Sequence, residues 1–122
     1  MIKILLSAGE ASGDLHAAAL TKAILALEPT AEIYGMGGEA MRAAGGEVVF
    51  DIKDHGVMGT VEVLRKLPQL YKLKKDFRKL MQDRRPDCFV TIDYPDFNMR
   101  IASMAKEMGI PIVAYIAPSA WV

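Results

Sequence analysis

The chain has 122 residues, of which 52% are hydrophobic and 25% are charged, as in an ordinary soluble globular domain. Fifteen Lys and Arg residues balance fifteen Asp and Glu residues, so the net charge gives no indication of a nucleic-acid partner. The apolar run in the first ten residues, MIKILLSAGE, is too short for a signal peptide, and no apolar run of about 20 residues occurs. We therefore expect one domain, residues 1–122, that is made and kept inside the cell.

Cysteine and histidine content argues against a disulfide or a metal site. Cys88 is the single cysteine, which fits a reducing cytosol, and its apolar neighbours predict a strand residue. His16 and His55 are far apart and have too few acidic or cysteine neighbours to suggest metal ligands. We expect no metal and no cofactor.

Short apolar segments alternate with segments of helical spacing along the whole chain. The expected strands are residues 2–7, 32–36, 47–50, 88–93 and 111–117. The expected helices are residues 12–27, 38–45, 60–84 and 95–109, with Ser12 as the first N-cap and Pro68 predicting a kink or a break. Because the strands are continuously apolar, the pattern predicts an α/β fold: a Rossmann-like, doubly wound parallel sheet with helices on both faces.

In such sheets ligands bind at the carboxyl ends of the strands, where SAGEASGD (7–14) follows the first strand. Gly9 and Gly13 allow the backbone to approach a ligand, but a tight strand-to-helix turn explains this loop equally well. It lacks both the G-x-G-x-x-G spacing and the Gly-Lys-Ser/Thr of a P-loop. The second strand ends in GMGG (35–38), without the acid that would bind a ribose, so NAD binding is disfavoured.

Two acids flank a Tyr-Pro step in VTIDYPDFN, residues 90–98. Pro95 is typical of a first helical turn, and Asp96 beside it would complement the helix dipole. Asp93 instead follows directly after the strand, where a carboxylate could accept a proton from a substrate hydroxyl. Asn98 is a candidate companion of Asp93.

The stretch from Val61 to Lys79 combines seven Lys and Arg residues, two acids and many apolar residues. Such a segment can lie on an anionic membrane surface, although an amphipathic helix with a solvated basic face explains it as well. Nucleic acid is disfavoured because the stretch has almost no aromatic residues for stacking.

Five motifs in order, SAGEASGD, GMGGEAMRAAG, VMGTVEVLRKLP, IDYPDFN and APSAW, resemble the N-terminal part of the lipid-A-disaccharide synthases. These are glycosyltransferases of the two-Rossmann-domain (GT-B) type. The resemblance implies transfer of 2,3-diacylglucosamine from UDP-2,3-diacylglucosamine to 2,3-diacylglucosamine 1-phosphate, with release of UDP. It also implies a peripheral location on the cytoplasmic face of the inner membrane of Gram-negative bacteria, at an anionic membrane surface; a homo-oligomer would be compatible.

The resemblance also assigns roles to residues. Asp93 matches the essential aspartate of the family, the expected base for the acceptor's 6′-hydroxyl. Residues expected to bind substrate are Gly9, Glu10, Ser12, Gly13, Asp14 and Asn98. Those expected to contact membrane or acyl chains are Val57, Met58, Val61, Leu64, Leu67, Leu70, Lys72, Lys74 and Lys75.

In the GT-B type the donor binds mostly to a C-terminal domain. We therefore expect this chain to be an incomplete N-terminal, acceptor-side domain that is inactive alone. Two alternatives remain from the sequence. One is another GT-B or sugar-nucleotide enzyme, and the other is a non-enzymatic α/β binding module.

Overall fold

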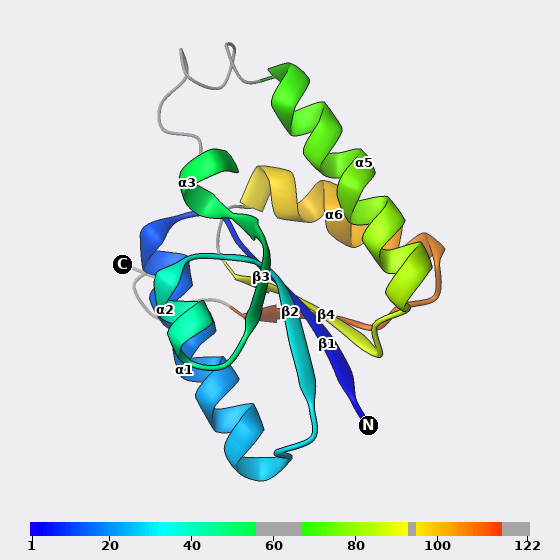
Figure 1. Ribbon diagram of the computed structural model, residues 1–122. Helices are drawn as coiled ribbons and strands as arrows, with labels where there is room; N and C mark the ends of the chain where they lie inside the picture. Colours follow the sequence, from blue (N-terminus) through cyan, green and yellow to red (C-terminus); the bar gives the residue numbers. More distant parts are fainter. Residues whose placement is uncertain (56–66, 93–94, 116–122) are drawn as a thin grey trace.

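The computed structural model describes residues 1–55, 67–92 and 95–115 (Figure 1). Its parallel sheet has five strands in the order β3-β2-β1-β4-β5. They are β1 (Lys3–Ala8), β2 (Glu32–Gly37), β3 (Glu47–Asp51), β4 (Cys88–Ile92) and β5 (Ile112–Tyr115). The expected α/β fold and its five strands are confirmed. The predicted extensions of β4 to residue 93 and of β5 to residue 117 lie outside the described residues.

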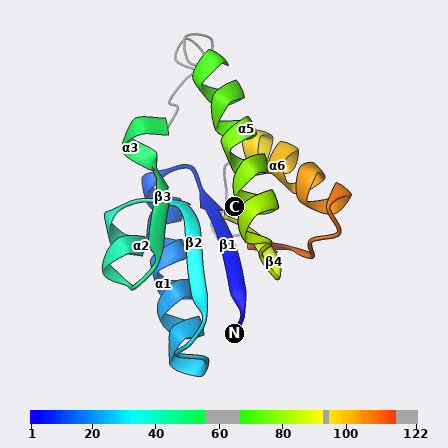
Figure 2. The same ribbon diagram turned by 45° about the vertical axis from the view of Figure 1, so that its right-hand side comes forward.

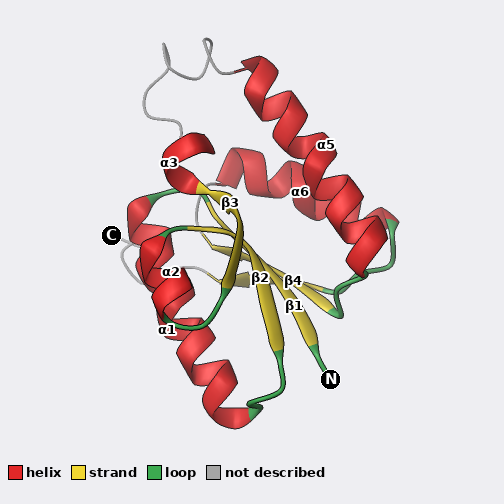
Figure 3. Cartoon of the chain, viewed as in Figure 1, coloured by secondary structure: helices red, strands yellow, loops and turns green. Residues whose placement is uncertain are grey.

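Helices lie on both faces of the sheet (Figures 2 and 3). They are α1 (Ala11–Leu27), α2 (Glu39–Ala43), α3 (Ile52–His55), α5 (Leu67–Arg84) and α6 (Pro95–Glu107). The view in Figure 2 shows α1 and α2 on one side of the strands and α5 and α6 on the other. This arrangement explains the continuous apolar strands, because both of their faces are covered.

Residues of β1 divide between the two cores because successive side chains of a strand point to opposite faces. Leu5 packs in the core beneath α5 and α6 with Phe77 and Phe89. Ile4 and Leu6 pack in the other core with residues of α1 and α2. All three β1 residues are buried, which makes β1 the central strand of both cores.

Two details of the expected helices need correction or completion. The expectation that Ser12 is the N-cap of α1 is wrong: the helix begins at Ala11, with Glu10 in extended conformation at the N-cap position. Pro68 lies in the first turn of α5 as described, where its missing N–H breaks no intrahelical hydrogen bond. The part of the expected helix before Leu67 lies outside the described residues.

Arg84, the last residue of α5, contacts residues of β2 and β3 in the sheet. Its guanidinium lies 3.8 Å from the ring centroid of Tyr34 in β2 and forms ion pairs with Glu32 at 3.6 Å and Glu47 at 3.0 Å. Burial raises the pKa of the Tyr34 hydroxyl to about 12, and the Arg84 charge offsets this only in part. Tyr34 is therefore neutral at physiological pH and serves as an apolar platform for the cation.

Gly35 of β2 allows a test of how closely β1 and β2 must approach each other. Its φ is 142°, and an added Cβ would lie 1.9 Å from the carbonyl oxygen of Leu6 in β1. We predict that Gly35→Ala lowers the free energy of unfolding by at least about 2 kcal/mol, because the strands must separate. Urea denaturation measures this change.

Gly109 is the matched control, since its φ is 75° but an added Cβ would have no neighbour within 4 Å. Gly109→Ala should lower the free energy of unfolding by about 1 kcal/mol from backbone strain alone. Equal losses for the two variants would contradict the steric explanation for Gly35.

Candidate functional site

The sheet has a topological switch point between β1 and β4. The chain leaves β1 through α1 toward β2 on one side, whereas β4 pairs with the other side of β1 and leads to β5. In open α/β sheets, the crevice at such a point, outside the carboxyl ends of the strands, is where ligands bind. Ala8 and Ile92 are register partners at these two strand ends. In the sequence, Gly9 follows Ala8 and Asp93 follows Ile92, so each is the first residue after one of two neighbouring strand ends.

Gly13 allows α1 to lie close to both of these strands. An added Cβ would be 3.2 Å from the Cβ of Ala8 and 3.6 Å from the carbonyl oxygen of Ile92. Gly9 is also buried, at the end of β1. The two glycines thus bring the first turn of α1 directly over the switch point, and a packing role accounts for Gly13 whether or not a ligand binds.

Glu10 and Ser12 are the exposed polar side chains at the start of α1. Glu10 occupies the N-cap position without a side-chain hydrogen bond to the helix, so no side chain caps α1. The first backbone N–H groups of a helix favour anionic groups. Together these residues give the rim of the switch point one carboxylate, one hydroxyl and the amino end of a helix.

Asp14 connects α1 to α2. Its carboxylate is buried and accepts hydrogen bonds from the backbone N–H groups of Gly38 at 2.8 Å, Ala40 at 3.0 Å and Met41 at 3.0 Å. It therefore caps the start of α2, a role that the sequence analysis, which assigned Asp14 to substrate binding, did not predict. These contacts account for its buried charge without a ligand.

Asn98 joins α6 to the ends of both strands at the switch point. Its Oδ1 accepts a hydrogen bond from Ser7 Oγ at 2.6 Å. Its Nδ2 donates to the carbonyl oxygens of Ser7 at 3.0 Å and Ile92 at 3.4 Å. Asn98 is 2% exposed, so it is a buried connection between α6 and the ends of β1 and β4.

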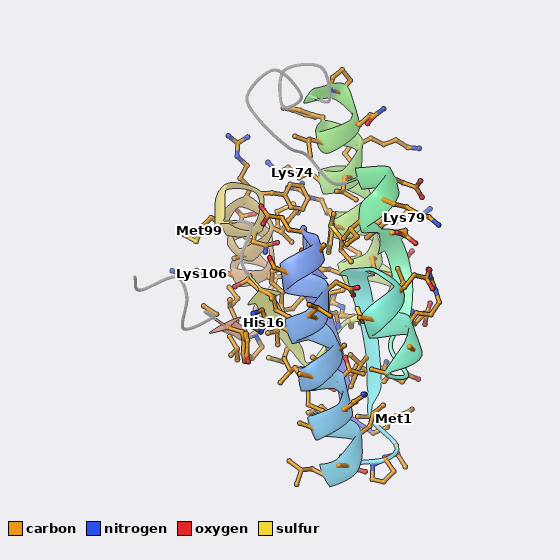
Figure 4. All side chains as sticks on the ribbon, turned by 90° about the vertical axis from the view of Figure 1, so that its left-hand side faces the viewer. Met1, His16, Lys74, Lys79, Met99 and Lys106 are labelled. Atoms are coloured by element: carbon orange, nitrogen blue, oxygen red, sulfur yellow. The ribbon has the colours of Figure 1, made fainter. Side chains whose placement is uncertain are left out.

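His16 and Tyr115 form a pair that sequence reasoning did not find. Their ring centroids are 5.8 Å apart, and Tyr115 is the register partner of Ile92 at the end of β4. Figure 4 labels His16 on α1. No local motif links residues 99 positions apart, so only the strand order could have revealed this contact.

The remaining expected site residues fall partly outside the described residues. Asp93, Val57, Met58, Val61 and Leu64 lie outside them, and only the backbone of Leu67 is described. Leu70 is half-buried and packs against the core beneath α5. Lys72 and Lys75 are exposed and Lys74 is half-buried, so the basic face of α5 is accessible as expected.

Other features of the described residues do not form a second site of this kind. Burial raises the pKa of the half-buried Cys88 thiol, which disfavours the reactive thiolate. No group of three or more metal-binding side chains occurs in residues 1–55, 67–92 and 95–115, and none of the helices there is long and apolar enough to cross a membrane. A hollow of about 580 Å³ beside Met1 and Asp87 lies at the opposite, amino edge of the sheet.

Residues 4–122 match the family model described as lipid-A-disaccharide synthetase. The chain is 46% identical over 125 residues to lipid-A-disaccharide synthase from Koribacter versatilis, covering 99% of this chain and 32% of that protein. It is 44% identical over 119 residues to the same enzyme from Geobacter metallireducens, covering 98% and 31%. The chain thus spans about a third of the length of these curated relatives.

Among solved structures, MurG from Acinetobacter baumannii has a similar fold. The TM-score is 0.61 at 11% sequence identity, and the match covers 95% of this chain and 34% of that chain. At this identity the likeness concerns the fold alone. It agrees with the Rossmann-like architecture expected for the N-terminal domain of a GT-B glycosyltransferase.

The contacts of Asp14 lead to a stability prediction. Asp14→Asn should lower the free energy of unfolding by about 1–3 kcal/mol, because the amide offers one acceptor oxygen and leaves at least one N–H group at the start of α2 without a partner. Urea denaturation measures the loss. Ser12→Ala, on the exposed side of the same turn, should change it by less than about 0.5 kcal/mol. An equally small change for Asp14→Asn would show that the cap contributes little.

Proposed function

The chain belongs to the lipid-A-disaccharide synthetase family, and on that premise we propose that it forms the acceptor side of a glycosyltransferase of lipid A biosynthesis. The reaction joins 2,3-diacylglucosamine from UDP-2,3-diacylglucosamine to 2,3-diacylglucosamine 1-phosphate and releases UDP. The observation that carries the proposal is the pairing of Ala8 with Ile92 at the switch point. In the sequence, Gly9 follows the first of these two paired strand ends and Asp93 follows the second.

In the proposed mechanism, Asp93 is the general base. Its carboxylate accepts the proton of the acceptor's 6-hydroxyl while the hydroxyl oxygen attacks the anomeric carbon of the donor. The bond from that carbon to the diphosphate breaks, and its electron pair leaves with UDP. A positioned base of this kind contributes about 10²–10⁴-fold to the rate.

The Gly9–Asp14 loop has the complementary role of holding the reacting sugars. Gly9 and Gly13 let them approach the backbone, and Glu10 and Ser12 present exposed polar groups to sugar hydroxyls. Asp14 and Asn98 act by fixing α2 and the ends of β1 and β4 beneath the crevice. We place the donor's nucleotide on the part of the relatives' length that this chain does not span, so the chain alone should not turn over.

The base assignment can be tested in a chimera in which residues 4–122 replace the matching segment of the Geobacter metallireducens enzyme. Release of UDP from the two acylated substrates measures turnover. Asp93→Asn should lower kcat by at least about 100-fold, because the amide cannot accept the proton.

Asp96→Asn is the matched control for charge, since the sequence assigns Asp96 to the start of α6. The turnover rate of the Asp96→Asn chimera should change little. Normal turnover by the Asp93→Asn chimera would mean that another group is the base. A folded wild-type chimera that releases no UDP would contradict the proposed function of this segment.

We further propose that the protein works as a peripheral protein on the cytoplasmic face of the membrane, through the basic segment 57–75. Support comes from Lys72 and Lys75, which are exposed on α5, and from the lipid character of the proposed substrates. Cations near an anionic leaflet each contribute about 1 kcal/mol to binding.

Sedimentation with vesicles of phosphatidylcholine and phosphatidylglycerol tests this surface. The purified protein should bind these vesicles more weakly as salt increases, and pure phosphatidylcholine vesicles weakly at all salt concentrations. Lys72→Gln/Lys75→Gln should weaken binding by about 30-fold, since each cation contributes about fivefold. Lys22→Gln/Lys106→Gln removes the same charge from other exposed positions and should have little effect. If the two pairs weaken binding equally, only net charge matters and the surface is assigned wrongly.

A further inference from the structure

His16 lies on the flank of α1 that faces β5, whereas Asp14 lies on the opposite flank. Two residues along a helix correspond to a rotation of about 200° about its axis. Accordingly, Asp14 bonds the start of α2, and the ring of His16 meets the ring of Tyr115 in β5, with centroids 5.8 Å apart. The proposed mechanism gives roles to Asp14 and to the glycines before it, and none to His16 or Tyr115.

Tyr115 is the last residue of β5 and lies beside the end of β4. It is the register partner of Ile92, and in the sequence Asp93 follows Ile92. Tyr115 also packs against the core on the α1 side of the sheet, of which Ile92 is a buried member. The rings of His16 and Tyr115 therefore lie on the β5 side of the switch point, level with the last residue of β4.

The imidazole of His16 is half-buried, and within residues 1–55, 67–92 and 95–115 it has no hydrogen-bond or ion-pair partner. Val113, two residues before Tyr115 on the same face of β5, is 50% exposed, so α1 does not cover this part of the sheet. An imidazole has at least one N–H donor in either protonation state. The contact with Tyr115 thus orients a ring whose polar atoms are bonded by no described residue.

The described segments around these strand ends contain a single basic side chain. Residues 7–16, 91–92, 95–98 and 112–115 include three acids, but His16 is the only Lys, Arg or His among them. The buried carboxylate of Asp14 is compensated by three backbone N–H groups, whereas the exposed carboxylate of Glu10 repels anions. A phosphate group in this crevice would therefore find its side-chain donor on the His16 side.

We infer that His16 binds a phosphate group of a substrate through an imidazole N–H, and that Tyr115 is the positioning residue that orients the ring. This inference rests on the proposed function, in which the acceptor carries a 1-phosphate and the donor carries a diphosphate. Both sources offer the same chemistry, because charged phosphate oxygens are strong hydrogen-bond acceptors. His16 thereby extends the substrate-binding surface from the Gly9–Asp14 loop along α1 to β5.

Two substitutions of His16 separate phosphate binding from ring packing. His16→Phe keeps a ring against Tyr115 but removes the N–H donor, whereas His16→Gln loses the ring but keeps a donor. In the chimera with the Geobacter metallireducens enzyme, His16→Phe should lower kcat/KM by at least about tenfold, because a hydrogen bond to a charged group is lost. His16→Gln should retain more activity than His16→Phe, with circular dichroism confirming that both are folded. The reverse order, or normal kcat/KM for His16→Phe, would overturn the inference.

An acceptor without phosphate identifies the source of the group, and it decides the case if both variants lose activity equally. With 2,3-diacylglucosamine in place of 2,3-diacylglucosamine 1-phosphate, the loss caused by His16→Phe should disappear if His16 binds the 1-phosphate. If the loss persists and UDP inhibits the variant at least about tenfold more weakly than the wild-type chimera, His16 binds the donor's diphosphate. A loss that persists with unchanged inhibition by UDP would mean that His16 contacts no phosphate.

A binding measurement on the purified protein keeps this inference separate from the proposed function. The chain has two histidines, His16 and His55, so their imidazole proton resonances are assigned by NMR with the His16→Phe variant. Inorganic phosphate and glucosamine 1-phosphate should shift the His16 resonance at constant pH and ionic strength, with His55 as the internal reference. Equal shifts of both histidines, or no shift of His16, would overturn the inference. A selective shift of His16 together with a chimera that releases no UDP would contradict the proposed function and leave the phosphate site intact.

Discussion

The hydrogen bonds of Asn98 hold together the three elements on which the candidate site depends. Strands β1 and β4 are distant in sequence, and their carbonyl groups at the switch point lie where the ladder between them ends. One buried amide bonds both strand ends and belongs to the helix that follows β4. A buried polar network of this kind is stabilising only when its members are satisfied, so it requires a single relative position of the strands and α6. The ends of β1 and β4 and the start of α6 are therefore held in one arrangement by contacts within the chain.

Asp14 gives the opposite side of the site a similar constraint. Its carboxylate fixes the amino end of α2, so the first turn of α1 is tied to the segment that follows β2. The two buried polar residues thus support the crevice from below, and Glu10 and Ser12 remain exposed at its rim. This division agrees with the general arrangement of binding sites, in which buried groups orient the structure and exposed groups meet the ligand.

The fold class could be predicted from the sequence because the spacing of apolar residues indicates which segments form strands and which form helices. The sequence predicted the five strands and the helix that begins at Pro95. It placed Ser12 at the N-cap wrongly, since Glu10 already has the extended backbone of that position. It could not show that Asp14 and Asn98 bond distant backbone groups, or that His16 meets Tyr115. Those contacts depend on strand order, which local patterns do not encode. The proposed roles of residues 57–66 and of Asp93 rest on the family resemblance rather than on described geometry.

The central position of β1 has a consequence for synthesis on the ribosome. Lys3 at the start of this strand bonds Asp87, 84 residues further along the chain. Because translation adds about 5–20 residues per second, one edge of β1 waits on the order of ten seconds for β4 to emerge. During this interval the nascent chain exposes an apolar strand that is paired on one side only, which is a substrate for chaperones. The pairing of β4 with β1 completes the candidate site. It thus also ends the stage of folding in which the nascent chain is most prone to misfolding.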